Sequence, residues 1–246
     1  MRKFLVEIQF NGKNYYGFQK LNGHATIASK ICEALQKLFD CEIDINGCSR
    51  TDAGVSAESY FFDFCVDTKL PTERIPFKLN RFLPKDIQAV SAREVEENFH
   101  ARYFAKSKTY EYRFYLSEHT LPLLNPRCYK LKPTIDLDAM TTACNLFVGK
   151  HDFSAFKTTS NDDKSCVRTI FSSTLLRDGN VLTFRICGDG FLYNMVRILA
   201  GTLVKIAYNE LSLDNLKTLL DQKLPRSSNP ALTLPPNALT LKSVEY

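Results

Sequence analysis

The 246-residue sequence lacks the residue spacings that hold metals and nucleotides in many enzymes. Its eight cysteines include no C-x-x-C pair, it has only four histidines, and it has no glycine-rich phosphate loop. It also lacks a secretory signal and any apolar run long enough to cross a membrane. We therefore expect a cytoplasmic protein with reduced thiols, and without a metal, a small-molecule cofactor or a membrane partner.

The charge balance is mildly basic. The formal net charge is +5 and the isoelectric point is near 8.7, with no polybasic tail. This excess is compatible with an anionic partner without identifying one. Hydrophobic residues make up 44% of the chain, which is enough for a packed core in one large or two moderate domains.

Hydrophobic periodicity and turn residues predict the same order of elements twice, namely strand, helix, strand, strand, helix, strand. In the first half these are Lys3–Phe10, Thr26–Phe39, Cys41–Cys48, Ser59–Val66, Pro71–Arg81 and Asp86–Arg93. In the second half they are Thr109–Leu116, Leu137–Phe147, Val167–Arg177, Val181–Cys187, Phe191–Ala207 and Ala238–Tyr246.

This repeated order predicts an α+β fold with two ferredoxin-like (RRM-like) halves and mainly antiparallel sheets, which form a central RNA-binding cleft. We assign the halves to residues 1–107 and 108–246. The segment Leu121–Pro133, with three prolines, is the expected connection between them.

A block of small residues surrounds an aspartate in the first half, from Gly47 to Ala57. Small side chains on both sides of Asp52 let other backbone approach closely. Arg50, two positions earlier, is suited to a phosphate or a carboxylate. The alternative is an ordinary Asp-x-Gly turn in which Asp52 binds its own backbone.

A second block, Asn98–Leu116, mixes four Lys or Arg residues with seven aromatic residues. Cationic groups contact phosphates and aromatic rings stack on bases, so this mixture is typical of sites for unstacked nucleotides. Tyr110, Tyr112 and Phe114 share one strand face. The alternative is that these rings are core, which we favour for Tyr112 and Phe114.

The third block is an apolar helix that carries one arginine. Arg197 is the only charged residue between Asp189 and Lys205, and it lies off the helix's main apolar stripe. An arginine in such a helix is rarely buried without an anionic partner. It pairs with a carboxylate or phosphate, or else it extends to solvent.

Taken together and in order, the three blocks resemble the TruA family of tRNA pseudouridine synthases. The residues that carry the resemblance are Ser49-Arg50-Thr51-Asp52-Ala53-Gly54-Val55, then Phe99-His100-Ala101-Arg102 with Lys108-Thr109-Tyr110-Glu111-Tyr112, then Gly190-Phe191-Leu192 with Met195-Val196-Arg197. The likeness extends over nearly the whole chain.

The resemblance implies an enzyme that isomerises uridine to pseudouridine at positions 38, 39 and 40 of tRNA. It implies that Asp52 is the essential carboxylate, that Arg197 pairs with it, that Tyr110 lies in the active site and that Arg50 holds the tRNA. It further implies a homodimer that needs no cofactor or metal.

The sequence departs from the family pattern at Ser49, where glycine is usual, and at Ser56, where histidine is usual. These departures bear on the choice of RNA more than on the chemistry. Three alternatives stay open: the same reaction at another RNA or tRNA position, a non-catalytic RNA-binding protein on the same fold, and a structural or interaction protein.

Overall fold

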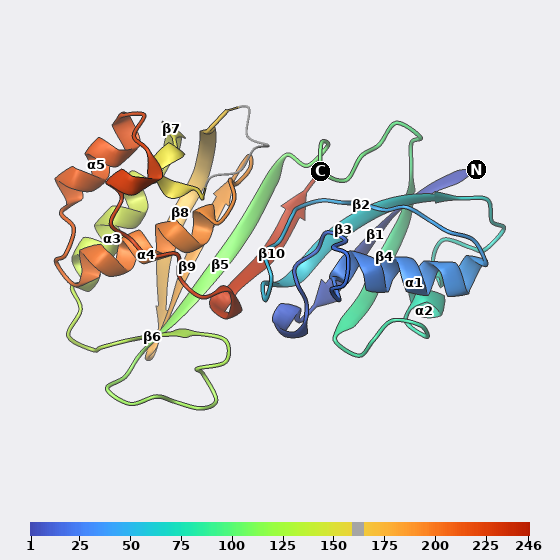
Figure 1. Ribbon diagram of the computed structural model, residues 1–246, viewed down its shortest axis with the longest axis horizontal. Coiled ribbons are helices and arrows are strands. Elements are labelled where there is room, and N and C mark those ends of the chain that lie inside the picture. The colour runs from blue at the N-terminus through green and yellow to red at the C-terminus, as the bar shows by residue number, and fades with distance from the viewer. Residues whose placement is uncertain (159–164) are drawn as a thin grey trace. The chain divides into compact units, whose positions relative to one another are not determined.

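A computed structural model describes residues 1–158 and 165–246, which divide into two compact units (Figure 1). The first unit holds Met1–Lys106 and Thr240–Tyr246, and the second holds Ser107–Leu239. We expected the last residues in the second half. They lie in the first unit, where Thr240 and Leu241 pair in parallel with Ser56 and Ala57. The expectation that Leu121–Pro133 connects the halves is wrong, because the whole segment lies inside the second unit.

The first unit is a mostly antiparallel sheet. Strand β1 is antiparallel to both β3 and β4, short β2 is antiparallel to the other edge of β3, and β10 joins β3 in parallel. The bounds are β1 Arg2–Phe10, β2 Asn46–Gly47, β3 Ser56–Val66, β4 Ile87–Val95 and β10 Leu239–Glu245.

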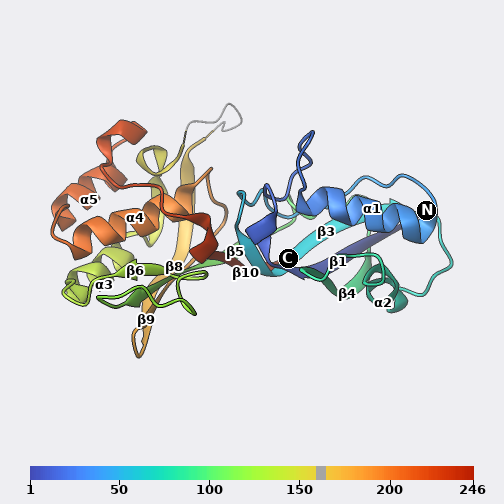
Figure 2. The ribbon, with the colours of Figure 1, turned by 60° about the horizontal axis from the view of Figure 1, so that its bottom comes forward.

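One face of this sheet carries the first core. The register pairs Phe4 with Phe64 and Val6 with Phe62, and all four rings or branched chains are buried. Helix α1 (Ile27–Phe39) packs on the sheet with its apolar stripe (Figure 2), and α2 (Arg74–Leu79) contacts both α1 and β4. Thr26 and Ser29 form a capping box that fixes where α1 begins.

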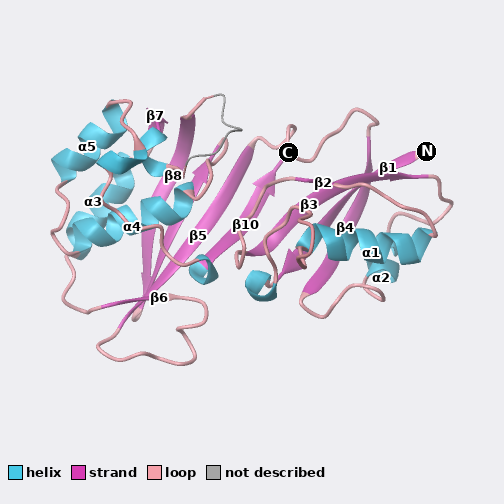
Figure 3. Ribbon diagram, in the orientation of Figure 1, coloured by secondary structure: helices cyan, strands magenta, loops and turns pink. Residues whose placement is uncertain are grey.

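The second unit has the sheet order β6-β5-β9-β8-β7, in which all neighbours except the parallel β5–β6 pair are antiparallel. Helices α3, α4 and α5 pack together on one side of these strands (Figure 3). The bounds are β5 Ser107–Leu116, β6 Tyr129–Leu131, α3 Leu137–Leu146, β7 Gly149–Asp152, β8 Val167–Asp178, β9 Val181–Gly188, α4 Met195–Ala207 and α5 Leu213–Asp221.

Three expected elements are shorter than predicted, and one of them is the helix expected over Pro71–Arg81, which spans only Arg74–Leu79. The helix expected from Phe191 begins at Met195, because Asn194 has a left-handed backbone (φ 60°) that no continuous helix admits. The strand expected over Cys41–Cys48 is reduced to Asn46–Gly47, the only part that pairs with β3. Both units are nevertheless helices on mostly antiparallel sheets, so the expected α+β class holds.

No helix in the described parts of the chain is both long and apolar enough to span a bilayer. The eight cysteines all lie in the described parts of the chain and form no disulfide there, and Cys48, Cys128 and Cys144 are buried.

Candidate active site

Asp52 lies half-buried in the loop between β2 and β3. The loop contains a turn in which the Val55 N–H donates to the Asp52 carbonyl at 3.2 Å and Gly54 takes φ 81°. The left-handed conformation is available to glycine without strain, which explains the glycine two positions after the aspartate.

A second segment, residues 11–18, packs backbone against backbone on this loop. The Phe18 N–H donates to the Thr51 carbonyl at 3.2 Å, and the Gly54 N–H donates to the Tyr15 carbonyl at 3.1 Å. Gly17 has φ 84°, and a Cβ there would lie 2.6 Å from the Thr51 oxygen. These hydrogen bonds fix the main chain on both sides of Asp52. The close approach that they need is possible because position 17 is a glycine.

Gly12 makes an equally close contact at the end of the loop, since a Cβ there would lie 1.9 Å from the Val55 oxygen. The Gly12 N–H also donates to Ser56 Oγ at 3.1 Å. The serine that departs from the family pattern therefore has a structural role, because its hydroxyl fastens the loop's end to the N-terminal segment.

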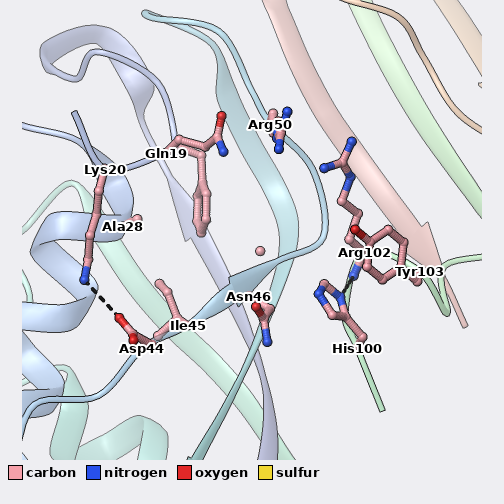
Figure 4. A pocket seen from close by; sticks show the side chains of 12 residues that line it. Gln19, Lys20, Ala28, Asp44, Ile45, Asn46, Arg50, His100, Arg102 and Tyr103 are labelled. Atoms are coloured by element: carbon pink, nitrogen blue, oxygen red, sulfur yellow. Dashed lines mark hydrogen bonds and ion pairs between the residues drawn. The ribbon is translucent and has the colours of Figure 1, made fainter. Parts of the chain in front are cut away.

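The start of the loop is anchored by a buried tyrosine. The Tyr60 hydroxyl donates to the Ser49 carbonyl, and the Phe18 ring stacks on Tyr60 at 4.4 Å between centroids. Arg50 follows directly and is exposed, beside a cavity of about 370 Å³ in the first unit (Figure 4). The loop therefore holds Asp52 half-buried and presents Arg50 to solvent.

In the second unit, Arg197 lies half-buried in the first turn of α4. Its Nε donates to the Leu234 carbonyl at 2.6 Å, and its Nη1 donates to Asn194 Oδ1 at 2.6 Å. Asn194 is itself held, because its Nδ2 donates to Thr158 Oγ1 at 3.0 Å. The guanidinium is thereby oriented by two different segments.

The segment that receives Arg197 packs tightly on α4. A Cβ on Gly201 would lie 2.1 Å from the Leu232 oxygen, so this close approach again requires glycine. The same segment receives the Tyr112 hydroxyl, which donates to the Pro235 carbonyl at 2.9 Å. Burial raises the pKa of Tyr112 above its ordinary range, which keeps this donor protonated.

Tyr110, Tyr112 and Phe114 form a buried row on β5. Tyr112 and Phe114 are fully buried, as expected for core rings, whereas Tyr110 is 6% exposed at the start of the strand. The Tyr110 ring meets Phe191 edge to face at 5.1 Å. Tyr110 thus lies at the end of this buried row that is nearest the surface, and it contacts Phe191, which follows Gly188-Asp189-Gly190.

The structure places Arg50 and Asp52 in one loop of the first unit, and Tyr110 and Arg197 in the second unit. The meeting of Asp52 with Arg197 stays a prediction. Among the residues described, no three His, Cys, Asp or Glu side chains gather as metal ligands would. The groups present are a carboxylate, an oriented guanidinium and a phenol, which suit acid–base and nucleophilic chemistry.

Sequence reasoning missed the residues that position this chemistry. Gly12, Gly17 and Gly201 are visible in the sequence, but the backbone that each one approaches comes from a distant segment. Asn194 gave a weak signal, since asparagine is among the few residues that adopt a left-handed backbone.

Comparison of the sequence with those of known proteins gives evidence that is independent of the site's geometry. A family model described as "tRNA pseudouridine synthase" matches residues 7–104 and 143–246. The chain is 37% identical to tRNA pseudouridine synthase A of Acetivibrio thermocellus, over 246 residues that cover all of both chains. It is 37% identical to tRNA pseudouridine synthase A 2 of Clostridium perfringens and 35% identical to the Clostridium kluyveri enzyme, again over their full lengths.

Among solved structures, the archaeal box H/ACA sRNP Nop10-Cbf5 complex contains a similar chain. The TM-score is 0.36 and the identity is 14%, with 79% of this chain and 45% of that chain covered.

We expect Gly17→Ala to disturb the Asp52 loop, and Gly23→Ala provides a matched control. Both glycines have positive φ, 84° and 77°, but a Cβ at Gly23 would meet nothing within 4 Å. Backbone strain should cost about 1 kcal/mol in each variant, and the collision with Thr51 should add about 1–2 kcal/mol in Gly17→Ala alone. Denaturant unfolding measures both losses.

Hydrogen exchange localises the effect, because the Phe18 and Gly54 amides donate across this contact. They should exchange faster in Gly17→Ala than in Gly23→Ala. Equal stability losses with unchanged exchange at both amides would show that the glycine contact does not fix the loop.

Proposed function

The chain belongs to the tRNA pseudouridine synthase family, and we propose that it isomerises uridine to pseudouridine in the anticodon stem-loop of tRNA, at positions 38, 39 and 40. The single observation that carries the proposal is the match with curated tRNA pseudouridine synthases at 34–38% identity. In seven of these relatives the match covers both chains completely, so the matched region extends over the positions of both Asp52 and Arg197.

The reaction is an isomerisation, so its atoms balance without a second substrate. The bond between uracil N1 and ribose C1′ breaks, the base turns, and C5 bonds to C1′. C5 then loses its proton, and N1 gains one. A carboxylate serves this sequence by adding to the nucleotide, by stabilising positive charge on the sugar, or by taking the C5 proton. We assign this role to Asp52.

The remaining assignments follow from the family resemblance, and the charge and shape of each side chain suit its role. Arg197, held by Leu234 and Asn194, is proposed to pair with Asp52 and to keep the carboxylate ionised and oriented. Tyr110 is proposed to contact the target base, which must leave the RNA stack to be reached. Arg50, exposed in the Asp52 loop, is proposed to hold the tRNA backbone.

We also propose that each half, residues 1–107 and 108–246, derives from a ferredoxin-like unit, with tRNA bound in a cleft that both halves line. Support comes from the first unit, whose sheet order β4-β1-β3-β2 with antiparallel neighbours is that of a split β-α-β unit. In the second unit, β5, β9 and β8 lie in the same order as β1, β3 and β2, again with antiparallel neighbours.

The rival function is a non-catalytic RNA-binding protein on the same fold. Such a protein needs cations and aromatic rings, but it has no need of a fixed carboxylate. The loop of Asp52 is held by two glycine contacts, by three main-chain hydrogen bonds and by the bond from the Gly12 N–H to Ser56 Oγ, which favours the catalytic proposal.

Asp52→Asn tests the proposal directly, with tritium release from [5-³H]uridine-labelled tRNA as the measurement. The change preserves shape and removes the charge and the nucleophile, so turnover should fall by about 10³-fold or more. Binding of tRNA should change by less than about threefold, because phosphate contacts dominate the interface. Asp67→Asn, at an exposed position of the first unit, should keep full activity.

Back-deamidation of the variant is excluded by its intact mass. Robust tritium release by the verified Asp52→Asn protein would refute the assigned role of this carboxylate.

Arg197→Lys tests the proposed pairing with Asp52. Lysine keeps the charge, but its single ammonium cannot reproduce a planar guanidinium that donates to several acceptors at once. We expect turnover to fall about 10- to 100-fold, with tRNA affinity nearly unchanged. Arg185→Lys is the control, since Arg185 binds Glu111 on β5 and has no proposed part in the chemistry. Wild-type turnover by Arg197→Lys would contradict the pairing, as would an experimental structure with the two side chains beyond hydrogen-bond reach.

The proposal includes a cytoplasmic homodimer. It rests on the family resemblance, on the eight cysteines that form no disulfide, which suit a reducing compartment, and on the short surface that one chain of 28.1 kDa offers to an anticodon arm. Sedimentation equilibrium at micromolar concentration should give about twice the chain mass. A single species at the mass of one chain would contradict the dimer.

A further inference from the structure

A cavity of about 370 Å³ lies in the first unit, beyond the β2 edge of its sheet. We call it the edge cavity. The lining residues on which the argument depends are Gln19, Asn46, Arg50, His100, Arg102 and Tyr103. Its size is in the range of pockets that hold one small organic molecule. Of the proposed active-site residues, only Arg50 lines it.

Cations and rings gather on one side of the edge cavity. Figure 4 shows Arg102, Tyr103 and His100 together, opposite the ion pair that Lys20 forms with Asp44 at 3.5 Å. The His100 and Tyr103 rings lie 4.3 Å apart, and the Arg102 guanidinium lies 5.9 Å from the Tyr103 ring. Tyr103 is 74% exposed, which is far more than a core ring would be.

Amide side chains complete the lining. Gln19 and Asn46 each bring one carbonyl oxygen and one NH₂ group, the groups that read the edge of a nucleobase. Arginine binds phosphate, and an exposed ring offers a face on which a base stacks. Phosphate binding, stacking and edge recognition are therefore all available around one volume.

A buried carboxylate builds both walls of the cavity. Asp63 is 0% exposed, and its Oδ1 accepts the Ala101 N–H at 2.6 Å, between the cavity residues His100 and Arg102. Its Oδ2 accepts from Asn46 Nδ2 at 3.0 Å, on the opposite wall, and lies 3.5 Å from Lys3 Nζ. An ionised group is rarely buried unless several partners hold it, so this arrangement fixes Asn46 relative to the segment 100–103.

The other side of Ala101 is held as well. The Tyr246 hydroxyl donates to the Ala101 carbonyl at 2.9 Å, and burial raises the pKa of Tyr246 above its ordinary range, so the donor stays protonated. The Tyr246 ring also packs against Phe61 and Phe99 at 5.3 Å. Both the N–H and the carbonyl of Ala101 are therefore hydrogen-bonded, and this fixes the backbone that carries His100, Arg102 and Tyr103.

We propose that the edge cavity binds one unstacked nucleotide of the RNA substrate, with the phosphate on Arg102 and the base against Tyr103. Gln19 and Asn46 contact the edge of that base, and Asp63 is a positioning residue for the site. The nucleotide is a second one, separate from the uridine that reacts at Asp52. The identity of the RNA as tRNA rests on the proposed function.

The test measures binding of a fluorescently labelled tRNA transcript by anisotropy at several salt concentrations. Tyr103→Ala should raise Kd about tenfold, because one stacked base is lost. Phe77→Ala is the matched control, since Phe77 is 63% exposed on α2 and does not line the cavity. Arg102→Ala should lower the slope of log K against log salt by about one, whereas Arg81→Ala, exposed beyond α2, should leave the slope unchanged.

Photo-crosslinking with 5-iodouridine-substituted tRNA locates the contact. A crosslink within the peptide that carries His100 and Tyr103, lost in Tyr103→Ala, supports the proposal. Asp63→Asn should weaken this crosslink while circular dichroism stays native. Should Asp63→Asn fail to fold, the two exposed variants still decide the question.

Wild-type affinity in both Tyr103→Ala and Arg102→Ala, or crosslinks at other segments only, would overturn the edge-cavity proposal. These outcomes are distinguishable from failure of the proposed function, because binding and crosslinking are read without turnover. A wild-type protein that crosslinks at Tyr103 yet releases no tritium would refute the catalytic proposal and leave the nucleotide site standing.

Discussion

The candidate active site depends most on one constraint: residues 11–18 and the Asp52 loop contact each other through their backbones. Gly12 and Gly17 bring the main chain of residues 11–18 against Thr51 and Val55 at distances that no Cβ allows. Hydrogen bonds across this contact fix the peptide groups before and after Asp52. A carboxylate on a mobile loop would sample many positions, and the entropy lost in ordering it would add to the activation free energy of the reaction.

The same device recurs around Arg197 in the second unit. Gly201 lets the segment around Leu232 pack on α4, and the Leu234 carbonyl of that segment accepts from the arginine. In both units, then, the charged side chain is placed by main chain that arrives from elsewhere in the sequence. Main-chain groups have few degrees of freedom, so this is an economical way to hold a side chain within a fraction of an ångström.

The sequence predicts the features that depend on neighbouring residues, and it does not predict those that depend on residues far away in the chain. The strand Lys3–Phe10, the helix Thr26–Phe39 and the hairpin around Asp178-Gly179-Asn180 have local patterns, and the structure confirms them. The α4 start at Met195 and the two-residue β2 were missed, because a left-handed Asn194 and the limited pairing with β3 depend on tertiary packing. Asp52 and Arg197 were selected by motif, whereas Gly17, Asn194 and Asp63 act through distant partners that no local pattern reveals.

The measurement that tests the account most directly is a map of pseudouridine in a full set of unmodified tRNAs after incubation with the purified protein. The account predicts new pseudouridine at positions 38, 39 and 40 wherever uridine occurs there, and none in the same tRNAs incubated with Asp52→Asn protein. New pseudouridine only outside the anticodon stem-loop would show that the substrate is wrong. No pseudouridine in any tRNA, from protein that binds tRNA normally, would contradict the catalytic function itself.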